Sequence, residues 1–393
     1  MPNFKFSRKL ILNKLFSEIT DIPVIVSTSY FSSLDGFRGI AIIAVLCCHL
    51  TYTTRFERYF VGNVGVEIFF VLSGFLITTL LLKEKVKTGR ISLRLFYIRR
   101  LLRIFPVAYL YLLVLVILNY CFTLNLIPND FLFSFLYIRN LPVNYGSGWW
   151  YTGHFWTLAI EEQFYLIFPW LLVAKLNTYI KIVILSVVII PLLQIGSPLL
   201  QFLEHHHIGA SLYPLYHAIH KFIFVISTLF GNGTNSILIG SLLSILIFKG
   251  ILPSGSIRRN HFLTFFILLL AIIFRTALNS FRSDVYIIPA LFSIVIAALI
   301  FLSLNSTDFL NTLLKNRLLV RTGILSYSIY VWQQLFTYNQ PWKNWFPYSD
   351  SVWLNYPALI VVSYLSYYFY EKRFLILKDK FAADKQSVIS KYH

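Results

Sequence analysis

The sequence predicts an all-α, polytopic membrane protein with about ten transmembrane helices, and three observations support this fold class. Hydrophobic residues make up 57% of the 393 residues and charged residues only 13%, about half the charged share of a soluble protein. The mean hydropathy is +0.69. Apolar runs of spanning length recur along the chain, and Lys and Arg concentrate in alternate connecting segments, as the positive-inside rule requires.

The expected spans are ten apolar runs of 17 to 21 residues, each long enough to cross a bilayer as a helix. They are 36–52, 62–82, 102–121, 158–174, 179–195, 232–249, 262–278, 286–304, 322–339 and 353–372. Three polar residues, His217, His220 and Lys221, interrupt the further segment 209–225, so we expect it to be interfacial or re-entrant.

The distribution of basic residues predicts the orientation. If both ends of the chain are cytoplasmic, 26 of the 34 Lys and Arg residues lie in inside segments and six in outside segments, while Arg38 and Arg275 lie at span ends. This bias places both termini on the cytoplasmic side of the membrane. It also explains the net charge of +18 without a nucleic-acid partner.

Three regions are expected: a cytoplasmic segment at 1–33, a membrane domain at 34–375 and a short cytoplasmic tail at 376–393. The first region lacks the sustained apolar stretch of a cleavable signal peptide. Residues Ser7 to Ile19 place apolar side chains on one face and basic ones elsewhere, which favours a short helix on the membrane surface. A loosely ordered tail is the alternative.

The first span carries ionisable residues in one line. Arg38 and His49 are eleven positions apart, three helical turns plus about 20°, so a helix would place them on one face roughly 16 Å apart. Asp35 falls on the same face. Because charged groups are costly in hydrocarbon, this stripe is a candidate active centre with His49 as general base. The alternative for His49 is a hydrogen-bonded core residue.

The second and third spans add further candidates. Gly62 to Thr78, GNVGVEIFFVLSGFLIT, contains Ser73, which could line a pocket or act as a nucleophile, although nothing nearby in the sequence activates it. The basic segment Arg94 to Pro106 holds Arg99, Arg100 and Arg103 at the cytoplasmic edge. Guanidinium groups match phosphate oxygens, which favours a phosphorylated ligand, whereas topology and anionic lipid would explain the charges without one.

The fourth and ninth spans carry polar side chains at helical spacing. Glu161 and Tyr165 can share a face as i and i+4, so Glu161 is expected to point into the bundle, and Glu162 is the better candidate for reaching the outer interface. Tyr330 and Gln333 belong to a stripe of the ninth span that also contains Ser326 and Thr337. Such a stripe can bind neighbouring helices or line a substrate path.

The external segments differ in composition from the internal ones. Residues 122–156 are nearly uncharged and rich in Tyr, Trp, Asn and Gly. Aromatic rings and amides suit a carbohydrate surface, because sugars stack on rings and exchange hydrogen bonds with amides. An aromatic belt at the membrane interface is the alternative.

Five of these motifs together resemble the acyltransferase-3 family of integral membrane acyltransferases, over Leu34 to about Lys378. They are LDGFRGIAIIAVLCCH, GVEIFFVLSGFLIT, FYIRRLLRIFP, HFWTLAIEEQFYLIFPW and SYSIYVWQQLF. The resemblance implies ten spans in a bacterial inner membrane and an acyl-CoA donor at the cytoplasmic side, and we expect no bound cofactor or metal. It also implies an acceptor hydroxyl on a surface polysaccharide, lipopolysaccharide, peptidoglycan or lipid-linked sugar.

The resemblance assigns Arg38 and His49 to the family's essential pair, the three arginines to donor binding and Glu161 to the acidic position. The chain departs from the family pattern at Gln333, where many members have a His. Many members also carry a C-terminal esterase-like domain, and here the chain ends about twenty residues after its last span. We therefore expect action alone or with a separate periplasmic partner.

The expected activity is transfer of an acyl group, most simply acetyl, from acyl-CoA to a hydroxyl of an envelope glycan or its precursor. The competing hypothesis is a transporter or flippase for a glycan-lipid, in which Arg38, His49 and Glu161 line a proton or substrate path. Only the first hypothesis requires a thioester, so consumption of acetyl-CoA separates the two.

Overall fold

The structure is a computed structural model that describes residues 8–51, 63–141, 144–205, 218, 221, 232–253, 261–280, 287–305 and 309–381. The described part of the chain contains helices and no strand. It divides into two compact units, each built from several stretches of sequence. One unit comprises Met1–Leu34, Phe69–Ile91 and Leu166–Leu313, and the other comprises Asp35–Ile68, Ser92–Tyr165 and Leu314–His393.

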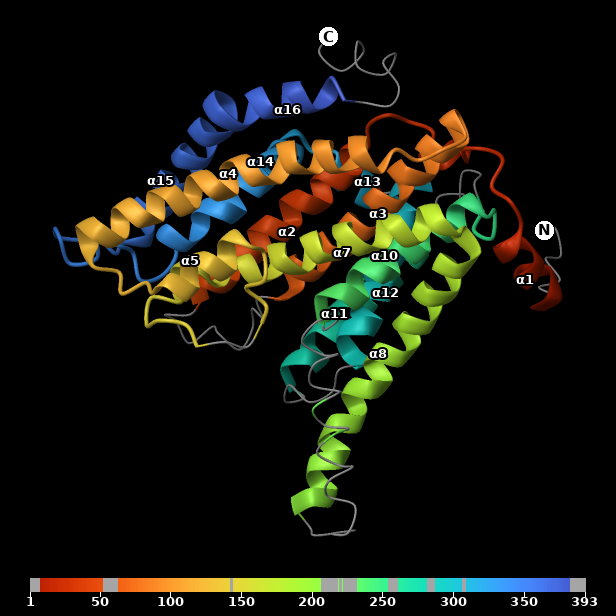
Figure 1. The fold of residues 1–393 in the computed structure, drawn as a ribbon, viewed down its shortest axis with the longest axis horizontal. Coiled ribbons are helices and arrows are strands. Elements are labelled where there is room, and N and C mark those ends of the chain that lie inside the picture. Colours follow the sequence, from red (N-terminus) through yellow and green to blue (C-terminus); the bar gives the residue numbers. More distant parts are fainter. Residues whose placement is uncertain are drawn as a thin grey trace. The chain divides into compact units, whose positions relative to one another are not determined.

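We call the second of these the site unit, because it holds nearly all of the candidate site residues. Its elements, labelled in Figure 1 where there is room, begin with the helix that carries the polar stripe. They are most of α2 (Ser32–Thr51), α4 (Leu93–Phe122), α5 (Pro128–Phe135), α6 (Trp150–Gly153), the first half of α7 (Phe155–Ala174), α14 (Arg317–Trp332), the 3-10 turn η4 (Gln333–Leu335), α15 (Val352–Leu365), the π-helical turn η5 (Ser366–Glu371) and α16 (Lys372–Asp379).

Local sequence explains where the long helix α4 begins and ends. Ser92 caps its start by accepting a hydrogen bond from the Leu95 backbone N–H at 3.4 Å. Thr123 ends it in a left-handed conformation with φ 50°. The helix therefore starts nine residues before the expected span at 102–121, so its first turns contain the arginine segment. Helix α16 packs along α4, as Figure 1 shows for the dark blue and orange helices.

Glycines allow α2 and α14 to approach closely within the site unit. A Cβ added at Gly323 would lie 1.8 Å from the Asp35 carbonyl oxygen, and one added at Gly36 would lie 2.0 Å from the Leu314 carbonyl oxygen. Backbone-to-backbone contact of this kind needs residues without a side chain. The stripe helix is thus held against α14 at the end where Asp35 and Arg38 lie.

The other compact unit contains the remaining helices. They are α1 (Arg8–Phe16), the 3-10 turn η1 (Val24–Val26), most of α3 (Asn63–Thr88), the second half of α7, α8 (Leu176–His205), α10 (Asn232–Phe248), α11 (His261–Ser280), α12 (Ile287–Asn305) and most of α13 (Phe309–Leu314). Helix α10 packs on both α8 and α12, and α11 packs on α12.

Buried hydroxyl pairs join α3, α8 and α10 in this unit. Thr78 donates to Ser241 at 2.8 Å, and the Tyr179 hydroxyl lies 2.6 Å from the same Ser241 oxygen. Hydroxyl groups in an apolar bundle pair across helices in this way because they have no water to bond. These pairs satisfy one another, so we interpret them as helix-to-helix contacts.

The N-terminal segment does form a helix, α1, within the predicted range Ser7 to Ile19. It contacts its own unit: Lys14 Nζ donates to the Gly250 carbonyl at 3.3 Å, and Lys249 Nζ donates to the Ser17 carbonyl. Whether α1 lies on a membrane surface stays a prediction.

Each of the ten expected spans overlaps a helix, but the ten crossings themselves stay a prediction. Among the described residues, four helical stretches are long and apolar enough to cross a membrane: Ser32–Leu50, Val64–Thr88, Leu93–Phe122 and Trp150–Ala174. Four shorter apolar helices occur within α8, α10, α11 and α12. The interrupted segment 209–225 lies almost wholly outside the described residues.

The helix within the expected ninth span, 322–339, ends earlier than predicted. Helix α14 ends at Trp332, and the 3-10 turn η4 follows. Ser326 and Tyr330 therefore lie on α14, whereas Gln333 and Thr337 lie beyond its end. All four side chains are buried, and the prediction that they share one face stays a prediction.

Candidate functional site

Helix α2 brings the predicted stripe into one continuous element. Its start carries an ion pair in which Arg38 Nη1 donates to Asp35 Oδ1 at 3.2 Å. Asp35 is 8% exposed, and Arg38 is half-buried. The pair is an i, i+3 contact, so Arg38 reaches toward the start of α2. His49 lies near the other end of the helix and is half-buried.

The predicted arginine cluster divides in two. Arg100 and Arg103 are half-buried and lie three residues apart on α4, so they share a face. The Arg100 guanidinium lies over the Tyr165 ring, 5.2 Å from its centroid. Arg99 instead donates to the Phe381 carbonyl at 2.9 Å, just after α16. The structure thus brings Arg100 and Arg103 together and turns Arg99 toward the C-terminal segment.

The charges of α2, α4 and α7 converge. Arg100 interacts electrostatically with Glu162 and Glu161 of α7 and with Arg38 of α2. Arg103 interacts with Arg38 and Arg100, which repel it, and with acidic groups that attract it. The three guanidinium groups repel one another, and the acidic groups that interact with them offset that repulsion. We call Arg38, Arg100 and Arg103 the arginine site.

The two adjacent acids of α7 both belong near the arginine site. Tyr165 donates to Glu161 Oε2 at 3.5 Å, which confirms the expected i, i+4 contact. Glu162 differs from expectation, because its Oε1 is buried instead of reaching an outer interface. Neighbouring residues differ by about 100° around a helix. Both carboxylates nevertheless interact with the same cation, Arg100.

His49 lies against an aromatic and amide cluster. Its ring meets the Trp150 ring edge-on, with centroids 5.2 Å apart. The Trp150 indole N–H donates to the Gln334 carbonyl at 3.0 Å, and the Gln334 amide donates back to the Trp150 carbonyl at 2.7 Å. This reciprocal pair links α6 to η4 and holds the indole in place beside the imidazole.

A second histidine, His154, belongs to the same end of the site unit. It is 4% exposed, and its ring meets the Tyr111 ring edge-on at 5.1 Å and lies 5.8 Å from the Tyr330 ring. The Tyr330 hydroxyl donates to the His154 carbonyl at 3.4 Å and contacts the Thr157 hydroxyl at 2.6 Å. Sequence reasoning missed His154, although a histidine at the mouth of a span was the available signal.

Gln333 is the most deeply buried of the predicted lining residues. It is 0% exposed, and neither polar atom of its side-chain amide has a hydrogen-bond partner among the described residues. A buried amide without partners costs about 1–3 kcal/mol per unsatisfied group. Such a group is suited to hydrogen bonds with a ligand. The predicted lining role is compatible with this position.

Sequence reasoning also missed Glu371. It is 6% exposed and accepts hydrogen bonds from Ser328 and Ser366, and its charge interacts with Arg103. Residues five apart lie about 140° apart on an α-helix, and the wider π turn η5 brings Ser366 and Glu371 together. Apolar run length and helical spacing do not predict a π turn.

Ser73 stands apart from the other predicted site residues. It is half-buried on α3, in the compact unit that does not contain His49. Its proposed roles as lining residue or nucleophile stay predictions.

Comparisons with known proteins bear on this site. A family model described as an acyltransferase domain matches residues 31–371. The chain is 38% identical over 162 residues to the peptidoglycan O-acetyltransferase OatA of Listeria monocytogenes, covering 36% of this chain and 24% of that protein. It is 30% identical over 378 residues to the putative peptidoglycan O-acetyltransferase YrhL of Bacillus subtilis, covering 87% of this chain and 54% of that protein.

A putative O-acetyltransferase of Staphylococcus aureus is 36% identical over 171 residues, covering 39% of this chain and 26% of that protein. The matches thus span between about a quarter and about half of the lengths of these relatives. No solved structure matches the chain.

Proposed function

We propose, because the chain belongs to the acyltransferase-3 family, that the protein is a multi-pass membrane O-acetyltransferase acting on a cell-envelope glycan. The donor is acetyl-CoA at the cytoplasmic side, and the acceptor is a hydroxyl of peptidoglycan or of a related envelope polysaccharide or lipid-linked precursor. The printed names of two relatives favour peptidoglycan among these acceptors.

One observation carries the proposal: α2 holds Arg38 within the arginine site at one end and His49 within an aromatic cluster at the other. The positive-inside orientation would direct the arginine end toward the cytoplasm, where acetyl-CoA is found. Guanidinium groups match the phosphates of CoA. The carboxylates nearby order the guanidinium groups by offsetting their mutual repulsion.

The geometry favours a guiding role for Arg38 over stabilisation of the reacting carbonyl. Eleven residues of helix separate it from His49 by about 16 Å, and its side chain bonds Asp35, toward the start of α2. Arg38 would bind the donor as it enters. The acetyl thioester would then reach His49 at the end of the pantetheine arm.

At His49 the acetyl group can move by two routes. In direct transfer, the neutral imidazole takes the proton of the acceptor hydroxyl while the oxygen attacks the thioester carbonyl. Collapse of the tetrahedral intermediate then releases the CoA thiolate, which receives the proton from the imidazolium. In the covalent route, the imidazole nitrogen attacks first and releases CoA, and the acceptor hydroxyl then takes the acetyl group from the histidine.

The proposal is tested with purified protein in liposomes, supplied with acetyl-CoA labelled in the acetyl group and with soluble peptidoglycan fragments. We expect labelled acetate in ester linkage on the glycan and release of equimolar CoA, measured by mass spectrometry and a thiol assay. If the purified protein consumes no acetyl-CoA with any envelope glycan, this result would contradict the proposal and favour the transporter hypothesis.

The arginine site makes a specific prediction for the donor. Arg100→Ala and Arg103→Ala should each raise the KM for acetyl-CoA about tenfold or more, because each removes a charge-assisted hydrogen-bond donor to phosphate. Arg94→Ala, which removes an exposed arginine of the same helix, is the matched control. Initial rates against donor concentration provide the measurement.

A second donor makes this test sharper. Acetyl-pantetheine lacks the CoA phosphates, so the two arginine variants and the wild type should use it with similar KM values. An equal loss with both donors would show that the arginines support structure and do not bind phosphate.

A further inference from the structure

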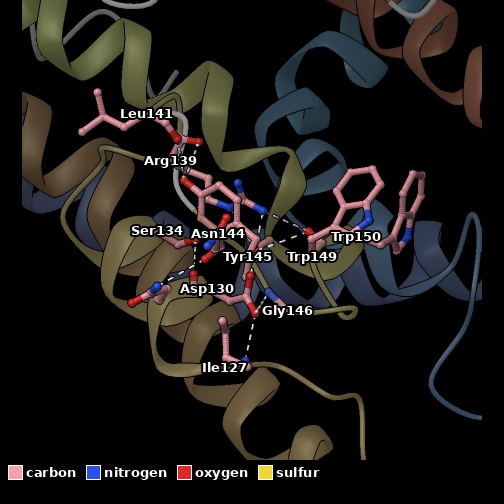
Figure 2. Close-up of polar contacts among 12 residues, drawn as sticks. Ile127, Asp130, Ser134, Arg139, Leu141, Asn144, Tyr145, Gly146, Trp149 and Trp150 are labelled. Carbon is pink, nitrogen blue, oxygen red and sulfur yellow. Dashed lines mark hydrogen bonds and ion pairs between the residues drawn. The ribbon is translucent and has the colours of Figure 1, made fainter.

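An exposed tryptophan lies one residue away from the ring that contacts His49. Trp149 is 53% exposed, whereas Trp150 is 7% exposed and packs against the imidazole. The two indole rings lie 6.2 Å apart at 76°, so one faces out and the other faces the site. Figure 2 shows both rings at the edge of the network of polar contacts.

The backbone beneath Trp149 is held by a buried arginine. Arg139 Nη2 donates to the Trp149 carbonyl at 3.4 Å, and its Nε donates to the Thr152 hydroxyl at 3.3 Å. The Trp149 backbone N–H donates to the Gly146 carbonyl at 3.0 Å. These contacts, drawn in part in Figure 2, fix the point where the chain enters α6.

Arg139 is itself held from two sides. It is 7% exposed and forms an ion pair at 4.0 Å with Asp130, which is 0% exposed. Its guanidinium lies over the Tyr145 ring, 3.2 Å from the centroid. Burial lowers the pKa of the Arg139 guanidinium, while Tyr145 and Asp130 act to raise it.

Asp130 completes the support by accepting backbone hydrogen bonds. Its Oδ2 accepts from the N–H of Ile127 at 2.8 Å and from that of Gly146 at 3.3 Å. One carboxylate therefore ties the start of α5 to the turn before Trp149. A buried ion pair adds little net stability, and its best-supported use is to specify one conformation. Here the conformation specified is the one that presents the Trp149 indole.

The chemistry of this segment indicates the occupant. Asp130 and Arg139 are the only charged residues in 123–149, and they pair with each other, so the surface offers no net charge to an ionic ligand. An exposed indole offers a flat apolar face, which matches the C–H face of a pyranose ring. An indole anchored only in lipid headgroups would need no such rigid support.

We propose that Trp149 is the platform on which a sugar ring of the acceptor glycan stacks, which makes it a specificity-determining residue. The inference rests on the proposed function, because the stacked sugar is the acceptor. Stacking on Trp149 brings a glycan hydroxyl toward the face of the site formed by Trp150 and His49.

The first test separates acceptor from donor kinetics. Trp149→Ala should raise the KM for peptidoglycan fragments about tenfold, the loss expected for one aromatic contact, and should leave the KM for acetyl-CoA unchanged. Trp149→Phe should recover most of the loss, because it keeps a ring. Trp353→Ala, which removes a tryptophan of α15 that is 90% exposed, is the matched control and should change neither value.

The second test needs no catalysis. Chitotetraose is a soluble tetramer of N-acetylglucosamine. Its binding to wild type, Trp149→Ala and Trp353→Ala is measured by microscale thermophoresis. We expect binding to wild type and Trp353→Ala, and a loss of about tenfold in Trp149→Ala. Absence of binding to wild type, or equal losses in the two variants, would overturn the inference.

The two proposals fail in different ways. A wild-type protein that binds chitotetraose through Trp149 but transfers no acetyl group would contradict the proposed function and leave the sugar platform in place. A wild-type protein that transfers acetyl groups, with Trp149→Ala unchanged in its KM for the glycan, would contradict the platform alone.

Discussion

Replacement of His49 by alanine is expected to lower the rate of acetyl transfer by at least about 100-fold, because a positioned general base contributes 10²–10⁴-fold. Binding of acetyl-CoA should persist, since Arg38, the residue of the arginine site that lies on α2, is about three helical turns away from His49. Turnover and calorimetric binding of acetyl-CoA, measured on the same preparation, separate the two effects. Arg38→Ala should lower both the rate of acetyl transfer and the affinity for acetyl-CoA.

The control for this experiment is His261→Ala, which removes an exposed histidine of α11. It should keep wild-type turnover. Unchanged turnover in His49→Ala would remove the basis of the mechanism, whatever the donor affinity.

Labelling of the wild-type protein distinguishes direct transfer from the covalent route. The wild-type protein is incubated with labelled acetyl-CoA in the absence of acceptor, quenched rapidly and analysed by mass spectrometry. His49 should carry the label only if an acetyl-histidine forms. CoA should then be released in an amount equal to the enzyme. No label and no release would favour direct transfer.

The second large effect is expected at Gly323. Gly323→Ala should destabilise the protein by about 3 kcal/mol, at the upper end for overpacking, because the new Cβ would lie 1.8 Å from the Asp35 carbonyl oxygen. Helix α14 must then move away from α2, which also disturbs the Asp35–Arg38 ion pair. Thermal unfolding, followed by size-exclusion chromatography in detergent, measures the loss.

Gly153→Ala is the matched control for the same chemical change. The nearest heavy atom to its added Cβ lies at 3.5 Å, an ordinary contact, so the melting temperature should stay close to that of wild type. Similar losses in both variants would show that the close approach of α2 and α14 is not what makes Gly323 sensitive.

Much of the fold could be predicted from the sequence because apolar length and helical spacing are local properties. The helix over Leu34 to His49 and the Glu161–Tyr165 contact follow from spacing alone. The family resemblance, carried by five motifs in order, is confirmed by the match over residues 31–371.

Contacts between distant segments could not be predicted in the same way. Arg99 and Arg100 are neighbours in sequence, yet one bonds the Phe381 carbonyl and the other lies over the Tyr165 ring. The partner of each arginine depends on where α16 and α7 lie, which spacing within α4 does not determine. Glu162 was misassigned for the same reason, since its surroundings come from another helix.

Trp149 illustrates a further limit. Composition suggested a carbohydrate surface over 122–156 as a whole, without distinguishing one aromatic residue from another. The hydrogen bond from Arg139 to the Trp149 carbonyl, with Asp130 and Tyr145 holding Arg139 in place, distinguishes Trp149 from its neighbours.

The π turn at Ser366–Glu371 has a consequence for the end of the chain. A π turn contains about one residue more than an α turn, so every side chain after Glu371 is out of phase by about 100° with the pattern set by α15. A helical wheel drawn through Val352–Asp379 without a break would assign the residues of α16 to the wrong faces. Deleting one residue within the turn would restore the phase of α15 and rotate α16 against α4.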